Sequence, residues 1–186
     1  SRLFARADRS AALAEIDRSL RTNPFRDEAW YLRGKILERS GQRFAQAAEQ
    51  KALTAQALES FEKARRLNPL EPYYDYRIAK NYPRANPDDL RPDRILGLYR
   101  AAVEKDPNDP KLLYLAGHQL LAWNLRPDPN SSSPSQPLRD PAVEAYARQI
   151  LDRARRHRPA DAPKVFESLW RYANKPTDLA TLRAQV

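Results

Sequence analysis

Four segments of this chain repeat one arrangement of small and bulky residues ahead of a proline. In each segment a small residue lies three positions after a bulky one, and a proline lies five positions after that small residue. In three of the segments another small residue lies four positions before the bulky one. Such similarity at a spacing of tens of residues indicates stacked helical units, which usually expose an extended binding face. The four series are Ala12, Ile16, Ser19 and Pro24; Ala57, Phe61, Ala64 and Pro69; Ile95, Tyr99, Ala102 and Pro107; and Ala147, Leu151, Ala154 and Pro159.

The composition favours helices throughout. The 186 residues include 16 prolines but only 4 glycines, and Ala, Leu, Arg and Glu dominate. Alanine and unbranched side chains lose the least conformational freedom in a helix. The prolines fall mostly between the periodic segments, where they begin and end helices. Since the length suits one domain with a real core, we predict a single all-α domain over residues 1–186.

The hydrophobic periodicity predicts nine helices, separated by Pro- or Gly-containing breaks. Ser40-Gly41 is predicted to end the second helix, because glycine is common just after a helix C-terminus. Residues 42–55 have no counterpart before Pro24, so we interpret them as a helix-extending insertion. Residues 126–139 lack periodicity and are rich in Pro and Ser, which predicts a flexible loop. The predicted helices span 3–22, 27–39, 43–67, 72–82, 93–105, 109–123, 140–156, 161–173 and 177–185.

The chain is basic, with a formal net charge of +9 and 25 arginines among its 33 basic residues. A basic balance favours acidic partners, nucleic acid or anionic membrane surfaces. The alternative is that arginines simply coat the solvent-facing sides of helices, since 24 acidic residues are interleaved with them. No apolar run approaches the ~20 residues needed to span a bilayer, so we expect no membrane span in this sequence.

Cysteine and methionine are both absent. Without cysteine there is neither a disulfide framework nor a cysteine-based metal site, and the sequence fits a cytoplasmic or an extracytoplasmic compartment equally well. Because position 1 is not methionine, we expect a fragment or a processed form.

The paired helices resemble tetratricopeptide repeats, which carry a bulky residue, a small residue and an aromatic or apolar residue at fixed positions of each forward helix. Arg33 departs from the pattern by taking a position where the family has leucine. The resemblance implies an α-solenoid of about four antiparallel helix pairs, wound into a right-handed superhelix with insertions. Gly34 and Ala79 are expected to let helices approach closely, while Phe61 or Tyr99 fills the remaining space. The forward-helix matches are Trp30, Gly34 and Leu37; Ile78, Ala79 and Tyr82; and Leu113, Ala116, Gly117 and Leu120.

A weaker resemblance concerns the segment from Leu67 to Arg77, Leu-Asn-Pro-Leu-Glu-Pro-Tyr-Tyr-Asp-Tyr-Arg. It is similar to repeat segments attached to bacterial membrane proteins of the O-antigen polymerase and ligase kind. This resemblance implies an accessory domain of a membrane-anchored enzyme of the cell envelope, with catalysis elsewhere in a longer chain.

Few residues suggest chemistry. The histidines are His118 and His157, and neither belongs to a metal-binding motif. There is no Gly-rich phosphate loop, and the serines at 131–133 lie in the predicted loop without a nearby base. We therefore expect no active site, no metal and no cofactor.

In the family, the second, fifth and ninth positions of each forward helix face the concave groove. A tyrosine recurs here at the fifth position, and tyrosine combines a rigid apolar ring with a polar tip that suits binding interfaces. Neighbouring cations are suited to pair with carboxylates. The alternative, left open by the sequence, is that the tyrosines only complete packing between repeats. The predicted partner-binding residues are Tyr31, Lys35, Tyr73, Tyr76, Arg77, Lys80, Lys111, Tyr114 and His118.

These observations lead to one preferred function and two alternatives. The preferred one is a non-catalytic scaffold that binds an acidic segment of a partner protein in the Tyr/Lys-lined groove. The first alternative is the envelope-polysaccharide accessory domain, which would be periplasmic. The second is RNA or DNA binding through arginine, which we rank last because few arginines align on one predicted face.

Overall fold

The computed structural model describes residues 2–44, 46–87, 91–125, 139–161, 163–164 and 167, with only the backbone described at 2–8, 43–44 and 161. Within these ranges the regular elements are helices and there is no strand, so the prediction of an all-α chain is confirmed for this part. The elements are α1 (Arg2–Thr22), α2 (Asp27–Phe44), α3 (Ala47–Leu67), α4 (Pro72–Ala85), α5 (Pro92–Lys105), α6 (Pro110–Asn124), α7 (Pro141–His157) and a 3-10 helix, η1 (Pro159–Asp161).

Some predicted elements lie wholly or mostly outside the described residues. The helix predicted over 177–185 lies outside the described residues, as does most of the one predicted over 161–173 and of the loop predicted over 126–139. Across the described helices, none combines the length and the apolarity that crossing a membrane requires.

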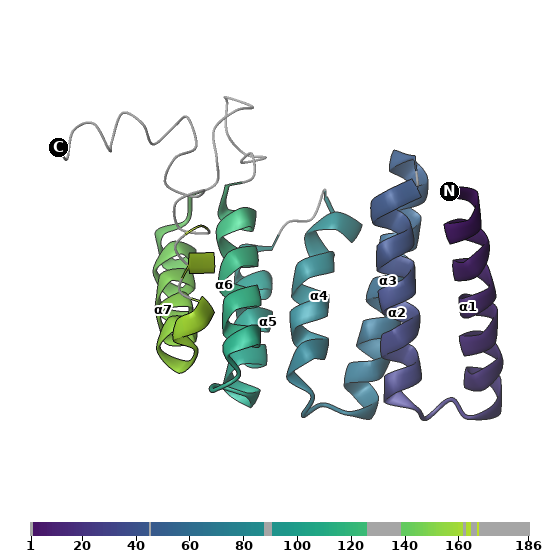
Figure 1. Ribbon diagram of the computed structural model, residues 1–186, viewed down its shortest axis with the longest axis horizontal. Coiled ribbons are helices and arrows are strands. Elements are labelled where there is room, and N and C mark those ends of the chain that lie inside the picture. The colour runs from purple at the N-terminus through teal and green to yellow at the C-terminus, as the bar shows by residue number, and fades with distance from the viewer. Residues whose placement is uncertain are drawn as a thin grey trace. The chain divides into compact units, whose positions relative to one another are not determined.

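The chain forms two compact units, Ser1–Lys105 and Asp106–Val186. In the first unit each helix packs against the next one along the chain, from α1 to α5, with alternating direction (Figure 1). In the second unit α7 packs against α6. Neighbour-to-neighbour packing of this kind is typical of helical repeats. That the two units form one domain stays a prediction.

Close helix approach in the first unit occurs at Gly34. A Cβ atom built on Gly34 of α2 would lie 2.5 Å from Cε1 of Phe61 on α3, and Phe61 is fully buried. Ala57 and Ala64, the small residues on either side of Phe61 in the repeated series, are also fully buried. The predicted combination of small residues with a bulky one is therefore confirmed at this interface.

The second unit contains the same arrangement. A Cβ atom on Gly117 of α6 would lie 2.5 Å from Cγ of Leu151 on α7. Ala147 and Ala154 flank Leu151 in the sequence, and all three are fully buried. Gly117 and Leu151 thus occupy the positions that Gly34 and Phe61 occupy in the first unit.

The predicted end of the second helix at Ser40-Gly41 is wrong, because α2 continues to Phe44. Gly41 is buried against α3, where a Cβ atom would lie 3.5 Å from both the Gln50 carbonyl oxygen and the Leu53 Cβ. No glycine among the described residues has a positive φ. Gly41 therefore serves packing between α2 and the first turns of α3 rather than the left-handed turn that ends many helices.

The turns that precede α2 and α4 share one local geometry. The Asn23 side-chain oxygen accepts a hydrogen bond from the Phe25 backbone N–H at 3.1 Å, and Asn68 accepts one from Leu70 at 3.3 Å. Asn and Asp side chains commonly stabilise turns in this way. As a result Phe25 and Leu70 occupy equivalent positions, and each leaves 79% of its surface exposed.

A polar contact ties three helix ends together in the first unit. The Asp27 carboxylate at the start of α2 accepts hydrogen bonds from Asn68, just past α3, at 3.0 Å and from the Tyr74 hydroxyl of α4 at 2.8 Å. Burial would raise the pKa of Asp27, but these two hydrogen bonds lower it below its ordinary value. The contact fixes the relative ends of α2, α3 and α4, and hence the side chains that α2 and α4 present.

Candidate functional site

The predicted binding residues divide between the two units. Those carried by α2 and α4 belong to the first unit, and those carried by α6 belong to the second. Each group is therefore described separately. The first group is Tyr31, Lys35, Tyr73, Tyr76, Arg77 and Lys80, and the second is Lys111, Tyr114 and His118.

Tyr31 is a half-buried residue at the junction of three helices. Its ring centroid lies 5.8 Å from that of Phe61 on α3 and 5.2 Å from that of Tyr74 on α4, both in tilted geometry. The Lys35 ammonium group lies 5.2 Å from the centroid of the Tyr31 ring, a cation–π contact. Tyr31 therefore packs against its neighbours and also supports a cation.

Tyr76 is only 2% exposed. Its ring meets Tyr73 edge-on at 6.3 Å and Tyr99 of α5 at 6.1 Å. Burial raises the pKa of the Tyr76 hydroxyl to about 12. In this structure Tyr76 therefore contributes to helix packing and offers almost no contact surface, whereas Tyr73 remains partly exposed.

A buried carboxylate lies where α2 faces α4. Glu38 of α2 is 4% exposed, and its two oxygens are held separately. Arg77 Nη1 lies 2.8 Å from Oε2, and Lys80 Nζ lies 2.7 Å from Oε1. The side chains of Arg77 and Lys80 are 21% and 17% exposed, so the two cations lie between the carboxylate and the solvent.

The pKa values reflect this arrangement. Burial alone would raise the pKa of Glu38, but Arg77, Lys80 and Arg84 together lower it below its ordinary value of 4.5. Burial alone would lower the pKa of Arg77, but Glu38 and the Tyr31 hydroxyl raise it above its ordinary value. Glu38 and Arg77 are consequently both charged at neutral pH.

Arg77, Lys80 and Arg84 of α4 act on the charge of Glu38, and Lys35 lies one turn before Glu38 on α2. We call these four cations, together with Glu38, the cationic cluster. Four positive charges against one negative charge leave this cluster with a net charge of +3. Half-buried charges of one sign raise the local potential and attract ligands of the opposite sign. The cationic cluster can therefore bind carboxylates, or another anion of similar size.

The ion pairs on the other face of α4 have nearly balanced charges. Its buried carboxylate, Asp75, pairs with Arg65 at 3.2 Å and with Lys105. Arg65 also contacts Glu62 at 2.7 Å, and Arg94 approaches Glu62 only at 3.8 Å from an exposed position. Charges of the two signs nearly balance here, so ion pairs on this face serve the packing of α3, α4 and α5.

Sequence reasoning missed Glu38 and Arg84. Glu38 lies one turn beyond Lys35 on the same stripe of α2, and Arg84 lies one turn beyond Lys80 on α4. A helix brings residues three and four apart onto one face, so extending each stripe by a turn would have found both. The predicted helix end at residue 82 concealed Arg84, whereas Glu38 lay inside the predicted helix and its cations are supplied by another helix.

In the second unit Tyr114 and His118 stack on each other, with ring centroids 5.9 Å apart and planes at 22°. Both side chains are half-buried, and Lys111 is exposed near the start of α6. The Asp109 carboxylate caps this helix by accepting hydrogen bonds from the backbone N–H groups of Lys111 and Leu112 at 2.8 and 3.2 Å.

The part of the chain with described side chains contains no group of three or more His, Cys, Asp or Glu residues suited to a metal ion. No protein-family model matches the chain, and neither does any curated protein. The resemblance to tetratricopeptide repeats therefore stays a hypothesis that rests on spacing.

Proposed function

We propose that this protein is a non-catalytic helical-repeat scaffold that binds an acidic segment of a partner protein along α2 and α4. The observation that carries the proposal is the net charge of +3 in the cationic cluster, held around a single buried carboxylate. A cluster that served folding alone would gain from balanced charges, as on the opposite face of α4, because unpaired charges near the interior are costly.

The dimensions suit a short peptide. Along α4 the stripe from Tyr73 to Arg84 covers about 16 Å at ~1.5 Å per residue. An extended peptide of about five residues has the same length. Partly exposed Tyr31 and Tyr73 would supply apolar contact beside the cations, which fits the mixed apolar and polar character of protein interfaces.

The repeat architecture supports the same proposal. Successive packing from α1 to α5, together with the equivalent pairs Gly34–Phe61 and Gly117–Leu151, is what stacked helix pairs would produce. In an α-solenoid of the tetratricopeptide kind, α2 and α4 would be consecutive forward helices lining one surface.

The test uses fluorescence anisotropy with synthetic peptides of alternating glutamate and serine, labelled with fluorescein. The glutamate peptide should bind the full chain, and the counterpart with lysine in place of glutamate should not. Lys35→Gln and Lys80→Gln should each weaken binding about threefold to tenfold, which corresponds to the ~0.5–1.5 kcal/mol of one partly exposed charge contact. Arg77 remains to neutralise Glu38 in the Lys80→Gln variant, so the fold is retained.

The matched control is Arg66→Gln, which removes the same charge from an exposed position at the end of α3. It should leave the affinity nearly unchanged. Equal weakening by Arg66→Gln would mean a diffuse charge effect rather than a site. Tighter binding of a single-stranded DNA probe, with affinity falling steeply as salt rises, would replace the proposal by nucleic-acid binding.

A further inference from the structure

A surface hollow of about 490 Å³ lies between the end of α4 and the first turns of α3. Its volume is within the ~300–1,000 Å³ typical of ligand pockets. The hollow adjoins the cationic cluster, since Arg84 belongs to both. The lining residues are Ala47, Ala48, Gln50, Lys51, Arg84 and Pro87.

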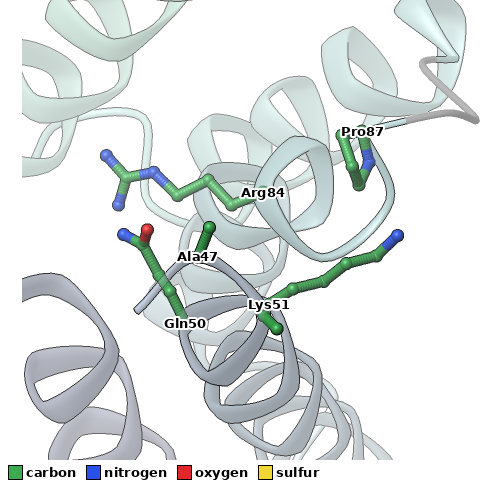
Figure 2. Close-up of a pocket in the computed structure, with 6 residues that line it drawn as sticks. Ala47, Gln50, Lys51, Arg84 and Pro87 are labelled. Carbon is green, nitrogen blue, oxygen red and sulfur yellow. The ribbon is translucent and has the colours of Figure 1, made fainter. Parts of the chain in front are cut away.

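The hollow combines an apolar floor with polar ends. The side chains of Ala47, Ala48 and Pro87 are apolar, and the hydrocarbon stems of Lys51 and Arg84 extend this surface. In Figure 2 the Arg84 guanidinium group lies on the same side as the Gln50 amide, with Ala47 between the two helices, and the Lys51 side chain extends in the opposite direction. Charged or polar groups thus border an apolar centre.

The guanidinium group of Arg84 is not fully used within the described residues. Its Nη1 atom is buried from solvent and has no hydrogen-bond partner. Buried donors are nearly always paired, because an unpaired one has lost its hydrogen bond to water, so such an atom needs an explanation. A carboxylate bound at this end of the hollow would accept this hydrogen bond once the guanidinium group turned toward the hollow, and it would supply the missing negative charge.

We infer that the hollow is the anchor site for the acidic segment, and that it takes one apolar side chain flanked by carboxylates. This inference rests on the proposed function and adds the sequence character of the partner. In an extended peptide, alternate side chains point to the same face. A Glu-x-Leu-x-Glu pattern would therefore direct the leucine toward Ala47 and Ala48 and its glutamates toward the cationic borders.

Two labelled peptides of equal charge test this inference. One contains Glu-Ser-Leu-Ser-Glu at its centre, and the other replaces the leucine by serine. The leucine peptide should bind about tenfold more tightly, because burying an apolar side chain is favourable and only part of that gain is lost when the peptide becomes ordered.

Filling the hollow should remove that preference. Ala47→Leu places an apolar side chain between Arg84 and Gln50, and the two peptides should then bind with the same affinity. The matched control is Ala52→Leu, the same change at an exposed position of α3 that does not line the hollow, and it should preserve the tenfold difference. Arg84→Gln should weaken both peptides while leaving the leucine preference in place.

The outcomes separate the inference from the proposed function. Equal binding of the two peptides to the unmodified chain, or a preference that persists in Ala47→Leu, would overturn the anchor site while leaving the scaffold function intact. Failure of both peptides to bind would overturn both. Ala47→Leu should keep its helical circular dichroism and its affinity for the serine peptide, which together would show that the variant is still folded.

Discussion

Gly34 and Phe61 meet so closely that a single methyl group on Gly34 would overlap the Phe61 ring. The ring is enclosed on all sides, which leaves it no free direction in which to move. This contact sets the separation of α2 and α3, and through it the position of the stripe that carries Tyr31, Lys35 and Glu38.

The first prediction concerns this contact. Gly34→Ala should lower the free energy of unfolding by about 1–3 kcal/mol, because overpacking a rigid core forces its neighbours to shift. Gly97→Ala is the control, since a Cβ atom there meets nothing within 4 Å. That change should stabilise the protein by ~0.5–1 kcal/mol through helix propensity alone. Urea unfolding followed by circular dichroism measures both, and equal effects would mean that α2 and α3 are loosely packed.

The second prediction transfers the argument to the other unit. Gly117→Ala should be destabilising because its Cβ atom would overlap Leu151. Leu151→Ala should cost about 2–5 kcal/mol by itself through the cavity it leaves. In the double variant the added methyl group enters that cavity, so the two effects should fall short of additivity by ~1 kcal/mol or more. A double-mutant cycle from thermal unfolding gives this coupling, and strict additivity would refute direct contact.

The third prediction is a pH dependence that comes from Glu38. Its folded-state pKa is lowered, so its contribution to stability is fully present above about pH 4.5 and is lost as the pH falls through the folded-state pKa. Glu38→Gln should therefore flatten the decline in unfolding free energy below pH 4.5. A residual slope from Asp27, whose pKa is also lowered, should remain. An unchanged slope in Glu38→Gln would show that the carboxylate is not held by its cations.

The same substitution separates folding from binding. Glu38→Gln removes the negative charge of the cationic cluster and should raise its net charge from +3 to +4. Stability should fall while the affinity for the glutamate peptide rises at neutral pH, measured by anisotropy. A substitution that acted only through unfolding would weaken binding instead.

The fourth prediction concerns Asn124, a fully buried residue at the end of α6. Its side-chain amide donates to the Asp140 carbonyl oxygen at 3.1 Å and accepts from the Asp140 N–H at 2.8 Å. Its backbone carbonyl oxygen accepts from the Arg139 N–H at 3.0 Å. Asn124→Ala should cost about 1–3 kcal/mol, because it removes both side-chain hydrogen bonds and leaves the Asp140 N–H without a partner, while the Asp140 carbonyl oxygen still accepts from the Glu144 N–H. Asn108→Ala, at an exposed position in the same unit, should have little effect on thermal unfolding.

Much of the helix packing could be predicted because it depends on local spacing. The repeated series placed Phe61 and Leu151 opposite small residues, and residues that share a helix face can be identified from their separation in the sequence. Gly41 could not be interpreted in this way. Glycine occurs both at helix ends and at close contacts between helices, and only its buried position against α3 distinguishes the two roles.

Hydrogen-bond partners that are far apart in the sequence could not be predicted either. Arg33, which departs from the family pattern, donates to Asp17 of α1 at 2.8 Å and to Ser60 of α3 at 2.9 Å. These partners lie 16 and 27 residues away, so spacing alone could not identify them. Glu38 escaped notice for a similar reason, since its role depends on cations supplied by α4.

In the equivalent turns at Phe25 and Leu70, the asparagine and the exposed apolar residue should differ in how freely they can be replaced. Asn23 and Asn68 are tied to the backbone and should change rarely, whereas the two apolar residues that follow are almost entirely surrounded by water. Polar replacements at Phe25 and Leu70 should improve solubility without disturbing the helices. These two positions are therefore the natural places to attach a dye or a crosslinker while leaving α2 and α4 untouched.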